Sequence, residues 1–134
     1  MPIITTFYAG LLGLLALALA ALVVTHRRRA GVGLGAGGDS GLERAIRVHA
    51  NFVEYAPLVV ILMGLAELCG APGWLLHGCG APFVVARVWH AAGLSRKSGV
   101  SGGRFFGTLV TWVVLLVLSL AALWLGGARM LAAG

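Results

Sequence analysis

The chain has 134 residues, 60% of them hydrophobic and only 10% charged, with a mean hydropathy of +0.98, which excludes a water-soluble globular domain. The net charge of +6 comes from a few cations beside apolar runs, so basic loops on one side of a membrane explain it better than nucleic-acid binding. The two cysteines lie in different apolar segments with no metal-ligand spacing, and we expect neither a disulfide framework nor a metal site.

The first predicted membrane span covers residues 3–25. This run is uncharged and long enough to cross the ~30 Å hydrocarbon core as a helix. The basic sequence His26-Arg27-Arg28-Arg29 ends it, and the glycine-rich residues 30–41 predict a loop. Asp39 or Ser40 is expected to cap the following helix, because a short polar side chain satisfies the free N–H groups of a first turn.

The second predicted span covers residues 42–69. At 1.5 Å per residue this helix is roughly 42 Å long, which exceeds the thickness of the hydrocarbon core. Its first turns must therefore protrude or lie among the lipid headgroups. The third span is predicted over residues 74–94 and the fourth over residues 104–125, with Gly126 and Gly127 expected to end it.

These four spans predict an all-α, integral membrane four-helix bundle formed by one domain, residues 1–134. The first and third loops hold most of the cations, including Arg27–Arg29, Arg96 and Lys97, whereas the turn between the second and third spans has none. Because basic loops stay in the cytoplasm, both termini are expected on the non-cytoplasmic side.

Polar residues gather at the head of the second span. At about 100° per residue, Arg47, Asn51 and Glu54 fall within about 60° of one helix face, and Tyr55 lies at its edge. A polar group at membrane depth costs about 2.5–3.5 kcal/mol on insertion scales. We therefore interpret this face as a candidate binding site.

The third span brings further polar residues to the same depth. If the second and third spans fold back about Ala71, Glu54 lies level with Arg87, and Asn51 lies within one residue of the level of His90. The cytoplasmic ends of the spans then bring together a convergent set: Arg47, Asn51, Glu54, Arg87, His90 and Arg104.

Purely structural explanations compete with this site. A simple ion pair between Glu54 and Arg87 would satisfy two charges in the apolar zone. Arg44 and Arg47 would also be explained if they extended the helix into the interface and reached lipid phosphates.

The polar sequence also resembles the signature of a known family, the membrane-associated proteins in eicosanoid and glutathione metabolism (MAPEG). The resemblance rests on Arg47-x-x-x-Asn51-x-x-Glu54-Tyr55-x-Pro57 in the second span, and on Arg87-x-x-His90 followed by a basic loop and Arg104. The resemblance covers essentially the whole chain, and the chain is similar to short bacterial-type members of the family.

The resemblance implies a homotrimer in a bacterial inner membrane, with glutathione as co-substrate held between neighbouring subunits near the cytoplasmic face. Carried over by motif position, the residues that would hold or line this pocket are Arg47, Asn51, Glu54, Tyr55, Arg87 and His90. The chemistry agrees, since glutathione offers carboxylates to arginine and an ammonium group to Glu54.

The resemblance further implies a membrane glutathione transferase in which Arg104 activates the thiol. A nearby guanidinium favours the thiolate, and Arg104 also opens a helix, where free N–H groups favour an anion. The expected reaction is attack of the thiolate on an apolar electrophile from the bilayer, with reduction of lipid hydroperoxides as a neighbouring possibility.

Two departures from the family pattern leave alternatives open. One turn after His90, where eicosanoid-type members carry a tyrosine, this chain has Leu94, so eicosanoid synthesis is not supported. Arg96 is a rival to Arg104 in the glycine- and serine-rich loop. The alternative function is a family member without catalysis that binds another anionic or lipid ligand. A small transporter or channel is disfavoured, because the first and fourth spans lack internal charges.

Overall fold

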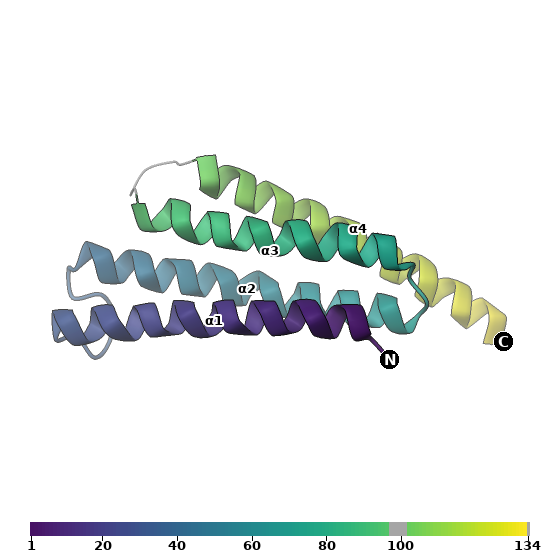
Figure 1. Ribbon diagram of the computed structural model, residues 1–134, viewed down its shortest axis with the longest axis horizontal. Coiled ribbons are helices and arrows are strands. Elements are labelled where there is room, and N and C mark those ends of the chain that lie inside the picture. The colour runs from purple at the N-terminus through teal and green to yellow at the C-terminus, as the bar shows by residue number, and fades with distance from the viewer. Residues whose placement is uncertain (97–101, 134) are drawn as a thin grey trace.

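The computed structural model is a bundle of four long helices in which successive helices run in opposite directions (Figure 1). It describes residues 1–96 and 102–133, with the side chains of these ranges except those of residues 93–96 and 104. The helices are α1 (Ile3–Ala30), α2 (Ser40–Leu68), α3 (Gly73–Arg96) and α4 (Gly102–Ala133). Both termini lie at the end of the bundle where α2 turns into α3. The predicted all-helical fold is confirmed.

The two central helices are α2 and α3. Each packs against both α1 and α4, whereas α1 and α4 do not contact each other within the described ranges. Three of the four described helices are long and apolar enough to cross a membrane, namely α1, α2 and α4 from Phe105 onward. Helix α3, which carries Arg87, two histidines and several glycines, is not among these three within the described residues.

The helices extend beyond the predicted spans. Helix α1 continues through the basic run to Ala30 and stops at Gly31, whose φ of 65° lies in the left-handed region that glycine adopts without strain. The prediction that Gly126 and Gly127 end the last helix is wrong, because α4 continues to Ala133. A glycine costs a helix only about 1 kcal/mol relative to alanine, and the residues that follow are mostly good helix formers.

The loop between α1 and α2 is tied to both helices. The Arg27 guanidinium donates to the carbonyls of Gly33 at 3.2 Å and Gly35 at 3.0 Å. The Asp39 carboxylate accepts from the backbone N–H of Leu42 at 2.7 Å, which confirms Asp39 as the cap of α2. The head of α2, where the candidate site begins, is therefore anchored on the end of α1.

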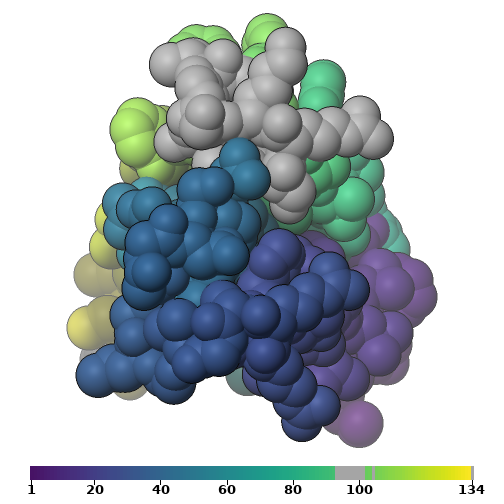
Figure 2. Space-filling model, turned by 90° about the vertical axis from the view of Figure 1, so that its left-hand side faces the viewer, coloured from purple at the N-terminus to yellow at the C-terminus, as the bar shows by residue number. Residues whose placement is uncertain are grey.

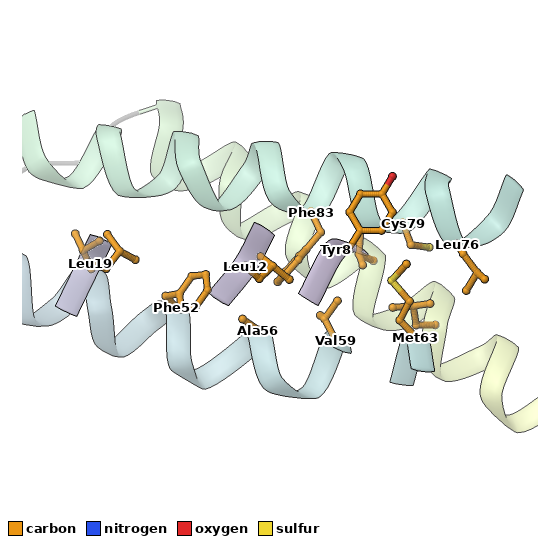
Figure 3. Packing of buried hydrophobic residues seen from close by; sticks show 13 residues of the cluster. Tyr8, Leu12, Leu19, Phe52, Ala56, Val59, Met63, Leu76, Cys79 and Phe83 are labelled. Atoms are coloured by element: carbon orange, nitrogen blue, oxygen red, sulfur yellow. The ribbon is translucent and has the colours of Figure 1, made fainter. Parts of the chain in front are cut away.

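Most of the hydrophobic core lies where α1, α2 and α3 meet (Figure 3), and α4 adds Val114 and Leu118 to it. Side chains from the three helices point toward one another there, and Phe83 and Val59 are almost completely buried. The labelled members of this core are Tyr8, Leu12, Leu19, Phe52, Ala56, Val59, Met63, Leu76, Cys79 and Phe83. Helix α2 packs against α1 through its apolar face. Its polar face, which carries Arg47, Asn51 and Glu54, therefore lies on a different side of the bundle.

At the end that holds the termini, Glu67 of α2 caps the start of α1. Its two carboxylate oxygens accept from the backbone N–H groups of Ile4 at 2.9 Å and Thr5 at 2.7 Å. These are free donors of a first helical turn, and a negative charge near them is favourable. Glu67 thus has a structural role, far along α2 from the candidate site.

Alanine at Gly80 is expected to destabilise the bundle, whereas alanine at Gly78 is not. A Cβ at Gly80 would lie 2.5–2.7 Å from ring atoms of Tyr8, whose hydroxyl is held by the His77 Nδ1 atom at 3.0 Å. Overpacking of this kind costs about 1–3 kcal/mol. At Gly78 a Cβ meets nothing within 4 Å, so only the gain in helix propensity remains.

Thermal unfolding of the two purified variants in the same detergent measures this difference. Gly80→Ala is expected to unfold several degrees below the parent, and Gly78→Ala at or above it. Equal melting temperatures for the two variants would contradict the close approach of α1 and α3 at this glycine.

Candidate functional site

The side chain of Arg87 joins three helices at the candidate site. Its residue is only 3% exposed, although it carries a positive charge. The Nη1 atom donates to Oδ1 of Asn51 on α2 at 2.9 Å, and the Nη2 atom donates to the carbonyl of Gly107 on α4 at 2.8 Å. A forked guanidinium can make these two bonds at once in a fixed geometry.

Two aromatic rings enclose the same guanidinium. Its central carbon lies 5.9 Å from the ring centre of Tyr55 and 5.6 Å from that of Phe83. A cation within about 6 Å of a ring face is attracted by the π electrons, and the attraction grows where water is excluded. The rings therefore stabilise the charge without neutralising it.

Gly107 allows α4 to approach α3 closely at this point. A Cβ there would lie 2.7 Å from Cβ of His90 and 3.0 Å from the carbonyl oxygen of Ala86. Gly103, one turn earlier, similarly faces the backbone of Trp89. Two glycines four residues apart let two helix backbones come together, as is common inside membranes.

Of the residues predicted on α2, Asn51 and Tyr55 contact Arg87, and Arg47 and Glu54 do not. Asn51 and Tyr55 are half-buried, whereas Arg47 and Glu54 are exposed on the surface of the protomer. The alternative of a Glu54–Arg87 ion pair is wrong for the described residues, because Arg87 is bonded to Asn51 instead. Counting from the turn at Ala71 predicts that Arg87 lies level with Glu54. In the structure Arg87 instead meets Asn51, about one helical turn earlier on α2.

The remaining predicted residues lie around the same end of the bundle. His90 is buried, 6% exposed, where α3 meets Gly107. The backbone of Arg104 belongs to the first turn of α4, but its side chain lies outside the described part, as do those of Leu94 and Arg96. Figure 2 views this end, with the α1–α2 loop and the head of α2 in the lower part of the view and α3 and α4 above them.

Sequence reasoning placed Arg104 of α4 at the site but missed the contributions of Gly107, Thr111 and Trp112 on the same helix. The carbonyl of Gly107 also accepts from the Thr111 hydroxyl at 2.7 Å, and the indole N–H of Trp112 points to the Tyr55 hydroxyl at 3.5 Å. The spacing of Gly103 and Gly107 was the one signal that could have indicated a close helix contact. A backbone carbonyl as the partner of Arg87 leaves no trace in a sequence.

The described part of the site holds an excess of positive charge. Arg87 has no carboxylate partner among the described residues, and its Nε atom is buried without a hydrogen-bond partner there. An uncompensated cation in a water-poor region raises the affinity for a nearby anion. The half-exposed Asn51 and the exposed Arg47 add further hydrogen-bond donors on the adjoining face of α2.

Comparison with known proteins agrees with this arrangement. Residues 5–124 match the profile of the MAPEG family. The chain is also 37% identical, over 127 residues, to the inner membrane protein YecN of Escherichia coli strain K12, covering 90% of this chain and 91% of that protein. YecN of Escherichia coli O6:H1 strain CFT073 matches with the same identity and coverage. The chain is a membrane protein that belongs to the MAPEG family.

Proposed function

We propose that this protein is a membrane glutathione transferase that attaches glutathione to apolar electrophiles dissolved in the bilayer. The observation that carries the proposal is the polar face of α2, on which Arg47 and Glu54 flank Asn51, the hydrogen-bond partner of the buried Arg87. Glutathione has two carboxylates and one ammonium group. A site to which Arg47 and Arg87 bring cations and Glu54 brings an acid suits that pattern of charges.

Glu54 is the proposed partner of the ammonium group. It is exposed on the protomer surface and forms no ion pair with a described residue, so its carboxylate is free to accept from a ligand. Arg47, two helical turns away on the same face, is the proposed partner of a carboxylate. About 10 Å separates residues seven positions apart on a helix, which suits the two ends of an extended tripeptide.

A neighbouring subunit is proposed to cover this face, in a homotrimer. Exposed residues on α2, together with the half-buried Asn51, recur at alternating spacings of four and three: Arg47, Asn51, Glu54, Leu58, Ile61 and Leu65. Such a seam is typical of helices that pack against each other. If this face contacted lipid, the charged side chains of Arg47 and Glu54 would each cost about 2.5–3.5 kcal/mol. Burial between subunits, with a bound ligand as partner, avoids this cost.

Arg104 is the proposed thiol-activating residue. The guanidinium would favour the thiolate, and the sulfur then forms a bond to the electrophilic carbon while the leaving group departs with its electron pair. The thiol proton passes to solvent. The basic run Arg27–Arg29 supports a site on the cytoplasmic side, where glutathione is available, and both termini on the other side.

Glu54→Gln is expected to weaken glutathione binding to the detergent-purified protein by about tenfold or more. The variant keeps the size of the side chain but loses the charge that meets the ammonium group, and a hydrogen bond to a charged group contributes about 1.5–3 kcal/mol. Isothermal calorimetry measures the affinity. Glu67→Gln is the matched control on the same helix, and it should lower the melting temperature through the α1 cap without changing the affinity.

Each outcome has a clear meaning. Saturable binding that weakens in Glu54→Gln alone supports the site, and conjugation of a chromogenic apolar electrophile then tests catalysis. Binding without turnover favours the alternative, a non-catalytic member that holds an anionic ligand. A well-folded parent that fails to bind glutathione refutes the proposed function.

A further inference from the structure

The orientation of the Asn51 amide is fixed by chemistry. An amide oxygen and an amide nitrogen look alike in shape, but a guanidinium has only donors. The Asn51 atom that faces Arg87 at 2.9 Å must therefore be the oxygen. The Asn51 NH₂ group consequently faces away from Arg87, on a half-exposed residue, and it donates to no group that the structure describes, a part that leaves out the side chains of residues 93–96 and 104.

Arg87 is the fixed partner of this pair. Its second N–H group is held by the Gly107 carbonyl at 2.8 Å, its charge lies against the rings of Tyr55 and Phe83, and its residue is 3% exposed. A guanidinium held at this many points cannot turn to follow a mobile amide. The Asn51 side chain lies at the edge of the same cluster and is held there by Arg87. The amide therefore adopts the orientation that Arg87 requires.

We infer that Arg87 is a positioning residue, which turns the Asn51 amide so that its NH₂ group meets the ligand. The position beside Asn51 then favours a hydrogen-bond acceptor, such as a carboxylate or carbonyl oxygen, and disfavours an ammonium group, which has only donors. With glutathione as the ligand, an inference that rests on the proposed function, the acceptor is a carboxylate or peptide carbonyl of the tripeptide. The ammonium group belongs at Glu54.

The Asn51→Asp variant separates the acceptor role of this side chain toward Arg87 from its donor role toward the ligand. The variant carboxylate still accepts from Arg87, now with a charge, but it offers no donor to the ligand. We expect the melting temperature to equal or exceed that of the parent while the dissociation constant for glutathione rises about tenfold or more. Unchanged glutathione affinity in Asn51→Asp would overturn the donor role of Asn51.

A second series tests the Arg87–Asn51 contact without any ligand. Melting temperatures are measured for Asn51→Leu, Arg87→Met and the double variant. The contact predicts that Asn51→Leu leaves the buried Arg87 without one acceptor and that Arg87→Met leaves the half-buried Asn51 oxygen without its donor, so the double variant loses less than the sum of the two shifts. Additive shifts would overturn the positioning role of Arg87.

The two series also distinguish this inference from the proposed function. If the parent binds no glutathione while the melting temperatures remain coupled, the proposed function and the donor role toward glutathione are both refuted, but the contact stands. If the parent binds and Asn51→Asp does not, the inference and the proposed function are both supported.

Discussion

Replacing Arg104 with alanine is expected to lower the rate of glutathione conjugation at neutral pH by about 100-fold, the usual cost of removing a group that stabilises a reacting anion. A free thiol has a pKa of about 8.5, so a small fraction of it is thiolate at pH 7. A guanidinium beside the sulfur lowers this pKa and raises the thiolate fraction. Without it, the bound thiol returns toward its ordinary pKa.

The sign of the pH dependence follows from the pKa of the glutathione thiol. The parent is expected to keep its rate near neutral pH, whereas the rate of Arg104→Ala should rise as the pH approaches about 8.5, because the thiol then ionises without help. The deficit of the variant therefore shrinks as the pH increases. Rates under saturating glutathione between pH 6 and pH 9 measure it, and the ultraviolet absorbance of bound thiolate gives an independent signal.

Arg96→Ala is the control, because Arg96 is the rival in the preceding loop. It should retain most of the parent rate at every pH. If Arg96→Ala lost the activity and Arg104→Ala kept it, Arg96 would be the thiol-activating residue. Full activity in both variants would contradict activation by either arginine.

The helices were predictable because an apolar run in a membrane has few alternatives. A span must satisfy its own backbone, so the apolar runs before the basic sequence at His26 and after Arg104 could only be helices. The cap at Asp39 followed from the same need of free N–H groups. Helix ends were less predictable, since Gly126 and Gly127 weaken α4 too little to stop it.

The polar face of α2 was also predictable, because helix periodicity alone brings Arg47, Asn51 and Glu54 to one side. Their partners were not predictable. Counting residues from the turn pointed Arg87 toward Glu54, but a long side chain spans a full turn, and packing against α4 selected Asn51 and a backbone carbonyl. Contacts of this kind depend on how far two helices separate, which Gly103 and Gly107 determine in three dimensions.

Gly107→Ala is the substitution with the largest expected effect on the fold. The added Cβ would lie 2.7 Å from Cβ of His90 and 3.0 Å from the Ala86 carbonyl oxygen, and neither atom is at the free end of a flexible side chain. Helices α3 and α4 must separate, which costs about 1–3 kcal/mol. Separation also removes the bond from Arg87 to the Gly107 carbonyl, and bonds from charged donors contribute about 1.5–3 kcal/mol.

Against these losses stands a gain of about 1 kcal/mol in helix propensity, so we expect a net destabilisation of about 3 kcal/mol. Gly126→Ala, on the same helix, has open space around its Cβ and should be as stable as the parent or more so. Denaturant unfolding in detergent compares the two variants. Because Arg87 loses its anchor on α4 only in Gly107→Ala, glutathione affinity should fall in that variant alone. A stable Gly107→Ala protein with parental affinity would show that the helices do not meet at this glycine and that Arg87 is not anchored there.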